Sequence, residues 1–481
     1  MNKLHTTRSW EFLGIDSINQ YNYLPMDTKS NVIVAMIDTG VWPESKSFND
    51  EDLGPVPPKF KGECTIGKFH IFKKYYSVLF KHHLTNIKPQ NGMDETDIVS
   101  SVSGFYLSNI DTYDVLVRIT YSNTLDPTLI RGKIVVCGLE SFTDDRSAKA
   151  VVIRQGGGVG MILIDPLVKH VSFQYVIPAT AIGQEEAQQL QAYMTTEKNP
   201  IATIKLTSTV LFTKPAPQLA VFSSMGPNII TPYPTPGLNI LAAWSPVSTT
   251  TTGGRNVDFN IISGTSMSCP HVSAVAAIIK SVHPSWSPAA IKSAIMTTAT
   301  ILDNTGKLIE RDLQGGTPTT PFDYGSGHIN PVAAVDPGLI YDFDSNDIID
   351  FLCSTGSTPS QMVYLTGVVV CCKNPPTPSY DFNYPSIGIS NMSGSLSVHR
   401  TVTYYGKGST VYYSQVDYPS GVKVKVTPNK LEFSQPGEKM SFRIDMTPYK
   451  SSNGSFVFGA LTWSNGVHRV RSPIAINVLS V

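Results

Sequence analysis

Cysteine is scarce in this 481-residue chain, and neither sign of charge is in excess. Six cysteines in a chain of this length are too few for a disulfide scaffold, although Cys353 with either Cys371 or Cys372 could close one short loop. Lysine plus arginine and aspartate plus glutamate each number 37, so the formal net charge is zero. The composition therefore predicts neither a nucleic acid nor an anionic membrane as a partner.

Long apolar runs and clusters of metal-ligating residues are also lacking. No apolar run reaches the ~18 residues that a membrane-spanning helix needs, and no group of residues shows the spacing of metal ligands. We therefore expect no membrane span, no metal and no cofactor. The N-terminal segment lacks the apolar core of a signal peptide. Two glycosylation sequons, Asn391-Met392-Ser393 and Asn453-Gly454-Ser455, nevertheless fit a secreted protein.

The residues that are present indicate a globular protein with several domains. Hydrophobic residues make up 41% of the chain and charged residues 15%, which argues against disorder, and the length suits roughly three domains of ~150 residues each. Residues 31–42 predict a buried strand that ends at Asp38. Residues 131–164 predict a strand, a helix that ends at Gly156 and a second strand, and residues 178–196 predict a further strand and helix. These two segments indicate a compact inserted domain of about a hundred residues.

The second half of the chain changes from helical to strand-like patterns. Residues 272–282 have helical spacing, and Ser287 followed by Pro288 predicts the start of a second helix. Residues 353–380 contain proline and cysteine and are typical of a linker. From about residue 381 onwards, short alternating segments separated by Gly, Pro and Asn predict a small antiparallel sandwich.

Ser266 is the first candidate for chemistry, because it lies where a turn of small residues becomes a helix. The first N–H groups of a helix have no partner within it and favour negative charge. A serine at this point can attack a carbonyl beside a donor for the resulting oxyanion, and Gly264 permits close approach of backbone or substrate. The alternative is an ordinary N-cap serine.

Asp38 is the second candidate, because it ends the predicted strand. A carboxylate there can orient an imidazole and hold its tautomer, and ligands of open α/β sheets lie beyond the carboxyl ends of the strands. One alternative is a turn aspartate that binds its own backbone. Another is half of an aspartic-protease site, but that mechanism needs a second Asp-Thr/Ser-Gly, which the chain does not contain.

Several segments of the chain resemble plant subtilisin-like serine proteases of the cucumisin type. Residues 263–299 resemble the nucleophile segment of that family, and residues 34–48 resemble its aspartate segment. Residues 222–228, 322–342 and 463–474 match its later signatures. The resemblance covers nearly the whole chain, and its longest motif is highly specific, so it favours the nucleophile role of Ser266 over the N-cap role.

The resemblance implies an α/β fold: a subtilisin-like parallel sheet with flanking helices, partly deleted, an inserted protease-associated domain and a C-terminal fibronectin-III-like β-sandwich. It also implies protein or peptide substrates, an extracellular location in the cell wall or apoplast, and a homodimer formed through the insert. The boundaries that it implies are 1–20 for a propeptide remnant or junction, 21–115 and 207–350 for a discontinuous, incomplete catalytic domain, 116–206 for the insert, 351–380 for the linker and 381–481 for the sandwich.

The catalytic histidine of the family has no counterpart in this chain. Carried over by motif, Ser266 matches the nucleophile and Asp38 the orienting carboxylate, but no Gly-His-Gly-Thr-His segment exists around any of the ten histidines. His82 and His83 form the only histidine cluster in the corresponding part of the chain. Their basic, bulky setting favours a solvated loop over a substitute base. His271 matches a structural position of the family.

The oxyanion asparagine of the family, in an Ala-Gly-Asn-Ser-Gly-Pro segment, also has no counterpart. The only Gly-Pro-Asn, at residues 226–228, belongs to a different motif, in which Met225 replaces the usual arginine. The family places several strands and helices between its aspartate segment and its insert, and residues 49–115 are too few to form them. We therefore expect a contiguous block of the catalytic core to be missing.

Three functions are compatible with these residues. The chain is a serine endopeptidase that uses an unrecognised base, an inactive relative that binds peptides or proteins, or a truncated gene product whose first half does not fold. A serine hydroxyl without a base is a poor nucleophile near neutral pH. We therefore expect a chain of protease lineage with little or no peptidase activity.

Overall fold

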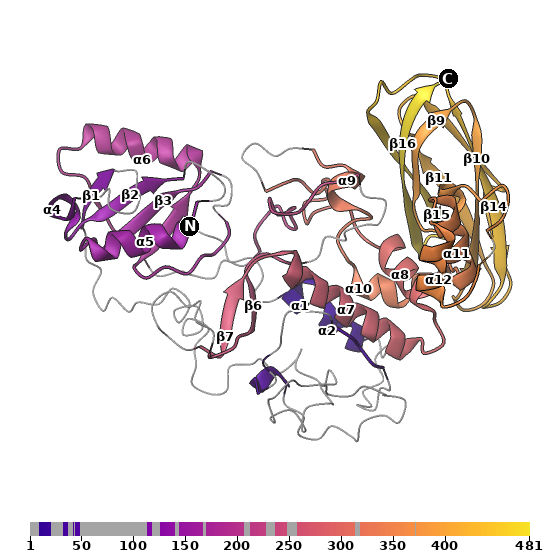
Figure 1. The fold of residues 1–481 in the computed structure, drawn as a ribbon, viewed down its shortest axis with the longest axis horizontal. Coiled ribbons are helices and arrows are strands. Elements are labelled where there is room, and N and C mark those ends of the chain that lie inside the picture. The colour runs from indigo at the N-terminus through magenta and orange to yellow at the C-terminus, as the bar shows by residue number, and fades with distance from the viewer. Residues whose placement is uncertain are drawn as a thin grey trace.

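The computed structural model of the protein forms an α/β unit, a central helical part and a C-terminal β-sandwich, arranged in that order across Figure 1. No helix among the residues it describes is both long and apolar enough to cross a membrane. The structure describes residues 9–20, 32–36, 42, 44–48, 113–117, 126–139, 144–166, 170–205, 212–227, 236–247, 257–312, 318–370 and 372–481.

The α/β unit is a five-stranded sheet with the strand order β4-β3-β2-β1-β5, in which only β5 is antiparallel to its neighbour. Helix α5 packs its Ile153 on one face of the sheet, and α6 packs Leu190 and Met194 on the other (Figure 1). The elements are β1 (Tyr113–Val117), α4 (Pro127–Ile130), β2 (Ile134–Gly138), α5 (Arg146–Gln155), β3 (Gly160–Ile164), β4 (Ala179–Ile182), α6 (Gln184–Thr196) and β5 (Ile201–Ala202).

The sequence predictions for this unit are confirmed element by element. Asp145 caps α5 by accepting hydrogen bonds from the Ser147 and Ala148 N–H groups, and the helix ends before Gly156 as expected. Strand β1 crosses the domain boundary predicted at residue 116, because its Val115 pairs in register with Ile134 of β2.

The central part packs helices around one apolar cluster. Leu13 and Ile18 from the N-terminal helical segment, Val275 and Ile279 from α7, and Ala294 from α8 are buried together there. Ser287 caps α8 by accepting a hydrogen bond from the Ala290 N–H, as predicted. The elements are α1 (Ser9–Phe12), α2 (Ile15–Gln20), η1 (Lys46–Phe48), β6 (Ile240–Ala243), β7 (Phe259–Ile262), α7 (Thr265–Val282), α8 (Pro288–Thr297), α9 (Pro321–Tyr324) and α10 (Pro331–Val335).

The buried strand predicted over residues 31–42 is wrong for its described part. Residues 32–36 form no strand, and Ile33 and Met36 are 44% and 46% exposed. A buried strand needs neighbours for its backbone groups and a cover for its side chains. In the described residues of the central part, the only sheet is the antiparallel pair β6–β7. Asp38 lies outside the described residues.

The C-terminal sandwich confirms the antiparallel pattern predicted from residue 381 for every strand pair except β9 and β16, which are parallel. One sheet has the order β12-β14-β10-β8 and the other β13-β11-β15-β16-β9, and their facing sides bury Tyr412 and Trp463. The strands are β8 (Leu339–Ile340), β9 (Ile387–Ser393), β10 (Leu396–Tyr404), β11 (Thr410–Asp417), β12 (Val422–Thr427), β13 (Lys430–Phe433), β14 (Lys439–Pro448), β15 (Phe456–Ser464) and β16 (Arg469–Ser480).

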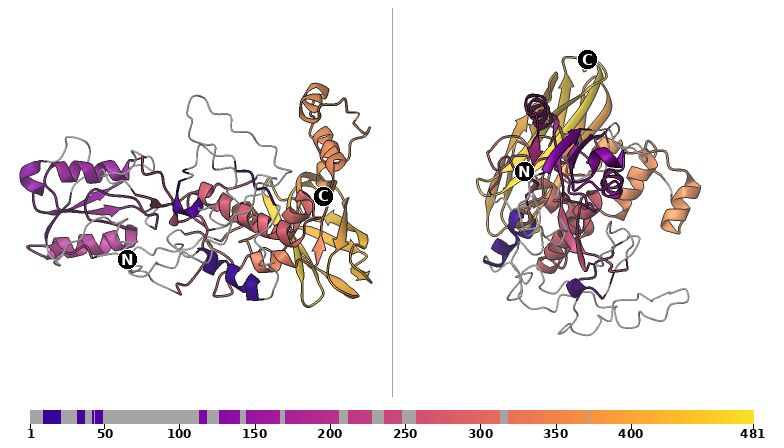
Figure 2. Two further views of the ribbon diagram at one scale, coloured as in Figure 1. Left: turned by 90° about the horizontal axis from the view of Figure 1, so that it is seen from below. Right: turned by 90° about the vertical axis from the view of Figure 1, so that its left-hand side faces the viewer.

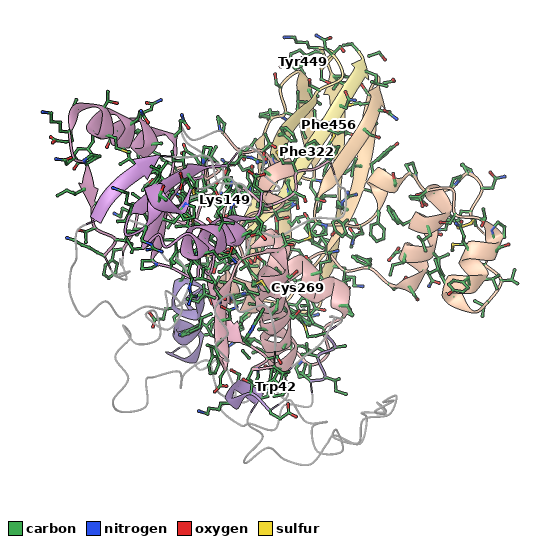
Figure 3. The ribbon with its side chains drawn as sticks, turned by 60° about the vertical axis from the view of Figure 1, so that its left-hand side comes forward. Trp42, Lys149, Cys269, Phe322, Tyr449 and Phe456 are labelled. Carbon is green, nitrogen blue, oxygen red and sulfur yellow. A yellow bond between two sulfur atoms is a disulfide. The ribbon has the colours of Figure 1, made fainter. Side chains whose placement is uncertain are left out.

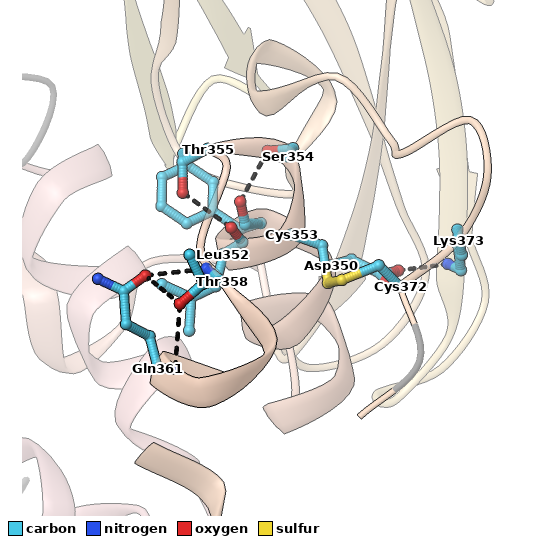
Figure 4. Close-up of a disulfide and its surroundings, with 10 residues drawn as sticks. Asp350, Leu352, Cys353, Ser354, Thr355, Thr358, Gln361, Cys372 and Lys373 are labelled. Carbon is cyan, nitrogen blue, oxygen red and sulfur yellow. Dashed lines mark hydrogen bonds and ion pairs between the residues drawn. A yellow bond between two sulfur atoms is a disulfide. The ribbon is translucent and has the colours of Figure 1, made fainter. Parts of the chain in front are cut away.

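The predicted linker contains regular structure. Helix α11 (Ser345–Ser354) crosses the boundary predicted at residue 350, α12 (Pro359–Thr366) follows it, and the short helix η2 (Ser379–Asp381) leads into the sandwich. The two longer helices project from the body as an arm (Figure 2). Of the two partners that the sequence left open, Cys372 forms the disulfide with Cys353 (Figure 4).

Candidate functional site

The candidate site is the loop that joins β7 to α7. The Gly264 N–H donates to the Gly237 carbonyl at 2.8 Å, and the Met267 N–H donates to the Gly264 carbonyl at 3.1 Å. A side chain on Gly237 would collide with the Ser268 hydroxyl and approach the Gly264 carbonyl to 2.9 Å. Gly237 therefore permits the close backbone contact that holds the start of α7.

Asn239 holds the same loop by hydrogen bonds to Ser263. The sequence analysis did not identify this residue. It is 1% exposed and has a φ of 54°, a left-handed conformation that asparagine tolerates better than most residues. Its N–H donates to Ser263 Oγ at 2.8 Å, and that hydroxyl donates back to Asn239 Oδ1 at 3.0 Å. The only signal in the sequence was a polar residue directly before the apolar run of β6.

The Asn239 side chain also joins the loop to the end of the α/β unit. Its Oδ1 accepts the Ser172 N–H at 2.8 Å, and its Nδ2 donates to the His170 carbonyl at 2.9 Å. Because Asn239 is buried, these hydrogen bonds leave little freedom to Ser263, which lies three residues before Ser266.

Ser266 is exposed at the second position of α7. The N-cap residue is Gly264 and no side chain caps the helix, so the N-cap reading of Ser266 is wrong. Among the described residues, none forms a hydrogen bond with the Ser266 hydroxyl. Pro270 has no N–H to donate to the Ser266 carbonyl one turn earlier. The hydroxyl thus lies at the positive end of an 18-residue helix with its approach open.

His271 lies on the same helix, and its ring nitrogens have partners other than Ser266. Its Nδ1 bonds the Met267 carbonyl at 2.8 Å and its Nε2 meets Ser9 Oγ at 2.8 Å. Burial lowers the pKa of His271. Both ring nitrogens are therefore occupied in a structural contact with α1, which agrees with the structural position that the sequence suggested.

His328 lies near His271 and is 7% exposed. Its ring packs edge-on against Phe12, with ring centroids 5.6 Å apart, and its Nδ1 bonds the Ile329 carbonyl at 3.0 Å. Burial lowers the pKa of His328 to about 4.

The other described histidines have partners of their own, and none of them contacts Ser266. His5, His70, His82 and His83 lie outside the described residues, as does Asn228. No group of three or more His, Cys, Asp or Glu side chains in the described part of the chain is arranged to hold a metal ion. The four other described histidines and their partners are His170 with Asp312 at 3.4 Å, His283 with the Val335 carbonyl at 2.7 Å, His399 with Asp381 at 3.1 Å and His468 with Asp336 at 3.1 Å.

An exposed serine at a helix N-terminus is a position from which a nucleophile can act when a base lies nearby. Comparison with known proteins gives the family. Residues 174–327 match the family described as "Subtilase family", and residues 381–476 match the family described as "Fibronectin type-III domain".

Relatives in plants match almost the whole chain. Subtilisin-like serine-protease S of Lotus japonicus is 45% identical over 658 residues, which cover 100% of this chain and 87% of that protein. Subtilisin-like protease SBT1.7 of Arabidopsis thaliana is 42% identical, covering 99% and 86%. The CO(2)-response secreted protease of Arabidopsis thaliana is 30% identical, covering 99% and 85%. The chain therefore belongs to the plant subtilisin-like serine proteases.

A likeness to solved structures adds nothing to this assignment. The subtilisin-like protease Apa1 of Pseudoalteromonas sp. AS-11 matches with a TM-score of 0.21 and 16% identity, covering 47% of this chain and 40% of that one. A score this low carries no argument about the arrangement of the central part.

Proposed function

We propose that Ser266 is the nucleophile of a subtilisin-like serine endopeptidase and that peptide-bond hydrolysis by this chain is severely impaired. One observation carries the proposal: Ser266 is exposed at the N-terminus of α7, and no described histidine is placed to take its proton. Asp38 keeps its assignment as the orienting carboxylate from the motif around it.

Two segments that carry catalytic groups in the family have no counterpart in the sequence, and the loss of each group would lower the rate. Loss of one triad member leaves a residual acceleration of ~10³–10⁴ over water, from binding and the oxyanion hole. Loss of one oxyanion donor costs a further ~10²–10³ in rate. The Gly-His-Gly-Thr-His and Ala-Gly-Asn-Ser-Gly-Pro segments are both missing. We therefore expect both losses to lower the rate of hydrolysis by this chain.

The alignment with relatives supports a missing block. The 658 positions aligned with the Lotus japonicus protease exceed the 481 residues of this chain by 177, and these positions have no counterpart here. The composition of helix α7 also supports a missing block. Lys280 is its only lysine, arginine or acidic residue, a composition typical of a helix covered on all sides. Yet only Val275 and Ile279 are buried.

The family also supports the other assignments. We assign residues 116–206, with the sheet that begins at Tyr113, as a protease-associated insert through which the chain forms a homodimer. We assign proteins or peptides as substrates and the cell exterior as destination, because one relative is itself named a secreted protease. Since the named relatives are proteases, we do not favour a role restricted to binding.

A fluorophosphonate probe tests the proposal, because it labels only a serine with an activated hydroxyl. The purified chain, the Ser266→Ala variant and an intact plant subtilase are treated side by side. We expect the chain to label no faster than Ser266→Ala, while the intact enzyme labels fully. Fast labelling of Ser266 would contradict the missing base, and the His82→Ala and His83→Ala variants would then show whether that histidine pair supplies a substitute.

A further inference from the structure

Two N-glycosylation sequons have no part in the site described above. Asn391-Met392-Ser393 and Asn453-Gly454-Ser455 are the only Asn-x-Ser/Thr tripeptides of the chain in which x is not proline. Both lie in the β-sandwich. Asn391 and Asn453 are exposed, as are the serines that complete the two sequons.

Asn453 lies in the turn between β14 and β15. Its φ is 52°, its N–H donates to Ser451 Oγ at 3.2 Å, and Ser455 N–H donates to the Ser452 carbonyl at 3.0 Å. No hydrogen bond of the Asn453 side chain exists among the described residues. An oligosaccharide on this side chain would therefore displace no contact of the folded turn.

Asn391 lies in β9, the edge strand of its sheet. Ile389 pairs with Ile476 and Met392 pairs with Val478, so two residues of β9 stand opposite one residue of β16. Because of this bulge, the Asn391 side chain is exposed, while the next residue, Met392, is fully buried. The side chain on the sheet edge thus faces away from the core.

The two acceptors lie at the same end of the sandwich. Val478 N–H donates to Ser452 Oγ at 2.9 Å, next to Asn453, and Val478 pairs with Met392, next to Asn391. Figure 1 shows the C-terminus, just after β16, at this end of the sandwich, and Figure 3 labels Tyr449, which precedes the Asn453 turn, at the same end.

We propose that Asn391 and Asn453 both carry N-linked glycans, which together cover this end of the sandwich and the free edge of β9. The Nδ2 of each asparagine forms the bond to the anomeric carbon of an oligosaccharide. The lipid pyrophosphate that carried the sugar leaves, and the amide proton is released with it. The inference rests on the extracellular destination proposed above, but it does not depend on Ser266.

Chain order gives Asn391 time to react. Strand β16 follows β9 in the chain and pairs with it. Asn391 therefore stays without this partner strand in the growing chain until β16 is made. In the folded protein, a glycan beside the open backbone of β9 blocks the addition of a strand from another chain.

The test directs the full chain into the plant secretory pathway by a cleavable signal sequence and analyses both secreted and cell-retained protein. Enzymatic deglycosylation in H₂¹⁸O marks each former glycan site in the peptide mass spectrum. We expect both Asn391 and Asn453 to be marked. The Ser393→Ala and Ser455→Ala variants should each lose one glycan, and Asn429→Gln, an exposed asparagine outside any sequon, should lose none.

An unmodified asparagine at either position would overturn the proposal of a paired cover. The shielding of β9 has its own readout in sedimentation. At equal concentration, Ser393→Ala should self-associate more than Ser455→Ala, because only the first loses the glycan on the edge strand. Equal self-association of the two variants would contradict the shielding. Neither result depends on hydrolysis, so failure here is separate from failure of the proposed peptidase lineage.

Discussion

At the scale of single residues, the structure assigns the histidines near Ser266 to packing rather than to proton transfer. His271 bridges Met267 and Ser9, and His328 is buried against Phe12. Both contacts attach the N-terminal helix α1 to the rest of the central part. A neutral imidazole suits these positions, because a buried charge without a partner is costly.

His328 predicts a pH dependence of stability. Its folded pKa of about 4 lies below the ordinary value of 6.5, so its contribution is complete above pH 6.5 and is lost as the pH falls towards 4. The shift corresponds to about 3 kcal/mol. Hydrogen exchange at α7 and α10 should therefore accelerate between pH 6.5 and 4, and His328→Gln should flatten that pH dependence.

The matched control is His399→Gln, since the His399 side chain is 63% exposed. It should leave the pH dependence of exchange at α7 unchanged. An equally steep dependence in His328→Gln would show that other groups cause it.

Asn239 predicts a local loss of stability. The Asn239→Ala substitution removes the side-chain bonds to Ser172 and His170 and leaves the Ser263 hydroxyl without its acceptor. We expect a cost of about 2 kcal/mol, seen as faster exchange of the amides around Ser263. Asn429→Ala, at an exposed position, should change nothing, and similar effects of the two would contradict the anchoring role.

At the scale of elements, the sequence predicted local structure well and the central fold poorly. Helix α8 could be predicted from Ser287 and Pro288, and α5 from its end at Gly156, because caps and breakers act over a few residues. The strand over 31–42 failed for the opposite reason. An apolar run becomes a strand only where partner strands exist, and partners are a property of the distant chain.

The candidate site was likewise only partly predictable from the sequence. Ser266 could be found from its motif, and its place in the first turn of α7 follows from local pattern. Asn239 could not be found, because its role depends on contacts with residues 67 and 69 positions earlier in the chain. The choice of Cys372 over Cys371 likewise required the geometry of the arm.

The disulfide of the arm predicts a further local effect. Cys353 and Cys372 are 19 residues apart, and closing a loop of this size contributes about 3 kcal/mol in the chain-entropy estimate. Cys353→Ser with Cys372→Ser should therefore speed hydrogen exchange in α11 and α12 and leave the sandwich strands unchanged. Cys269→Ser, at an exposed free cysteine, is the control; unchanged exchange in the arm would contradict the estimate.

At the scale of the whole molecule, the central part packs against the sandwich. Figure 3 shows Phe322 of the central part beside Phe456 of the sandwich, and their ring centroids are 4.9 Å apart. The Tyr341 N–H also donates to Ser293 Oγ at 2.9 Å. These contacts join α8 and α9 of the central part to the sandwich.

The proposed loss of activity belongs to the same scale. A subtilisin-like site takes its three catalytic groups from different strands and helices of one domain, so the block that we propose to be missing would remove a base while the nucleophile motif stays intact. In subtilisin itself, loss of the histidine costs about as much as loss of the whole triad, ~10⁶ in rate. We therefore expect the Ser266→Ala substitution to cause almost no further loss of peptide-bond hydrolysis.

The most direct measurement compares peptide-bond hydrolysis by the homogeneous full chain with that by its Ser266→Ala variant, on a quenched-fluorescence peptide library and on unfolded protein. The account predicts two equal rates, both near that of buffer alone. Rapid hydrolysis by the unaltered chain that disappears in Ser266→Ala would contradict it and would require a base that the described histidines do not supply.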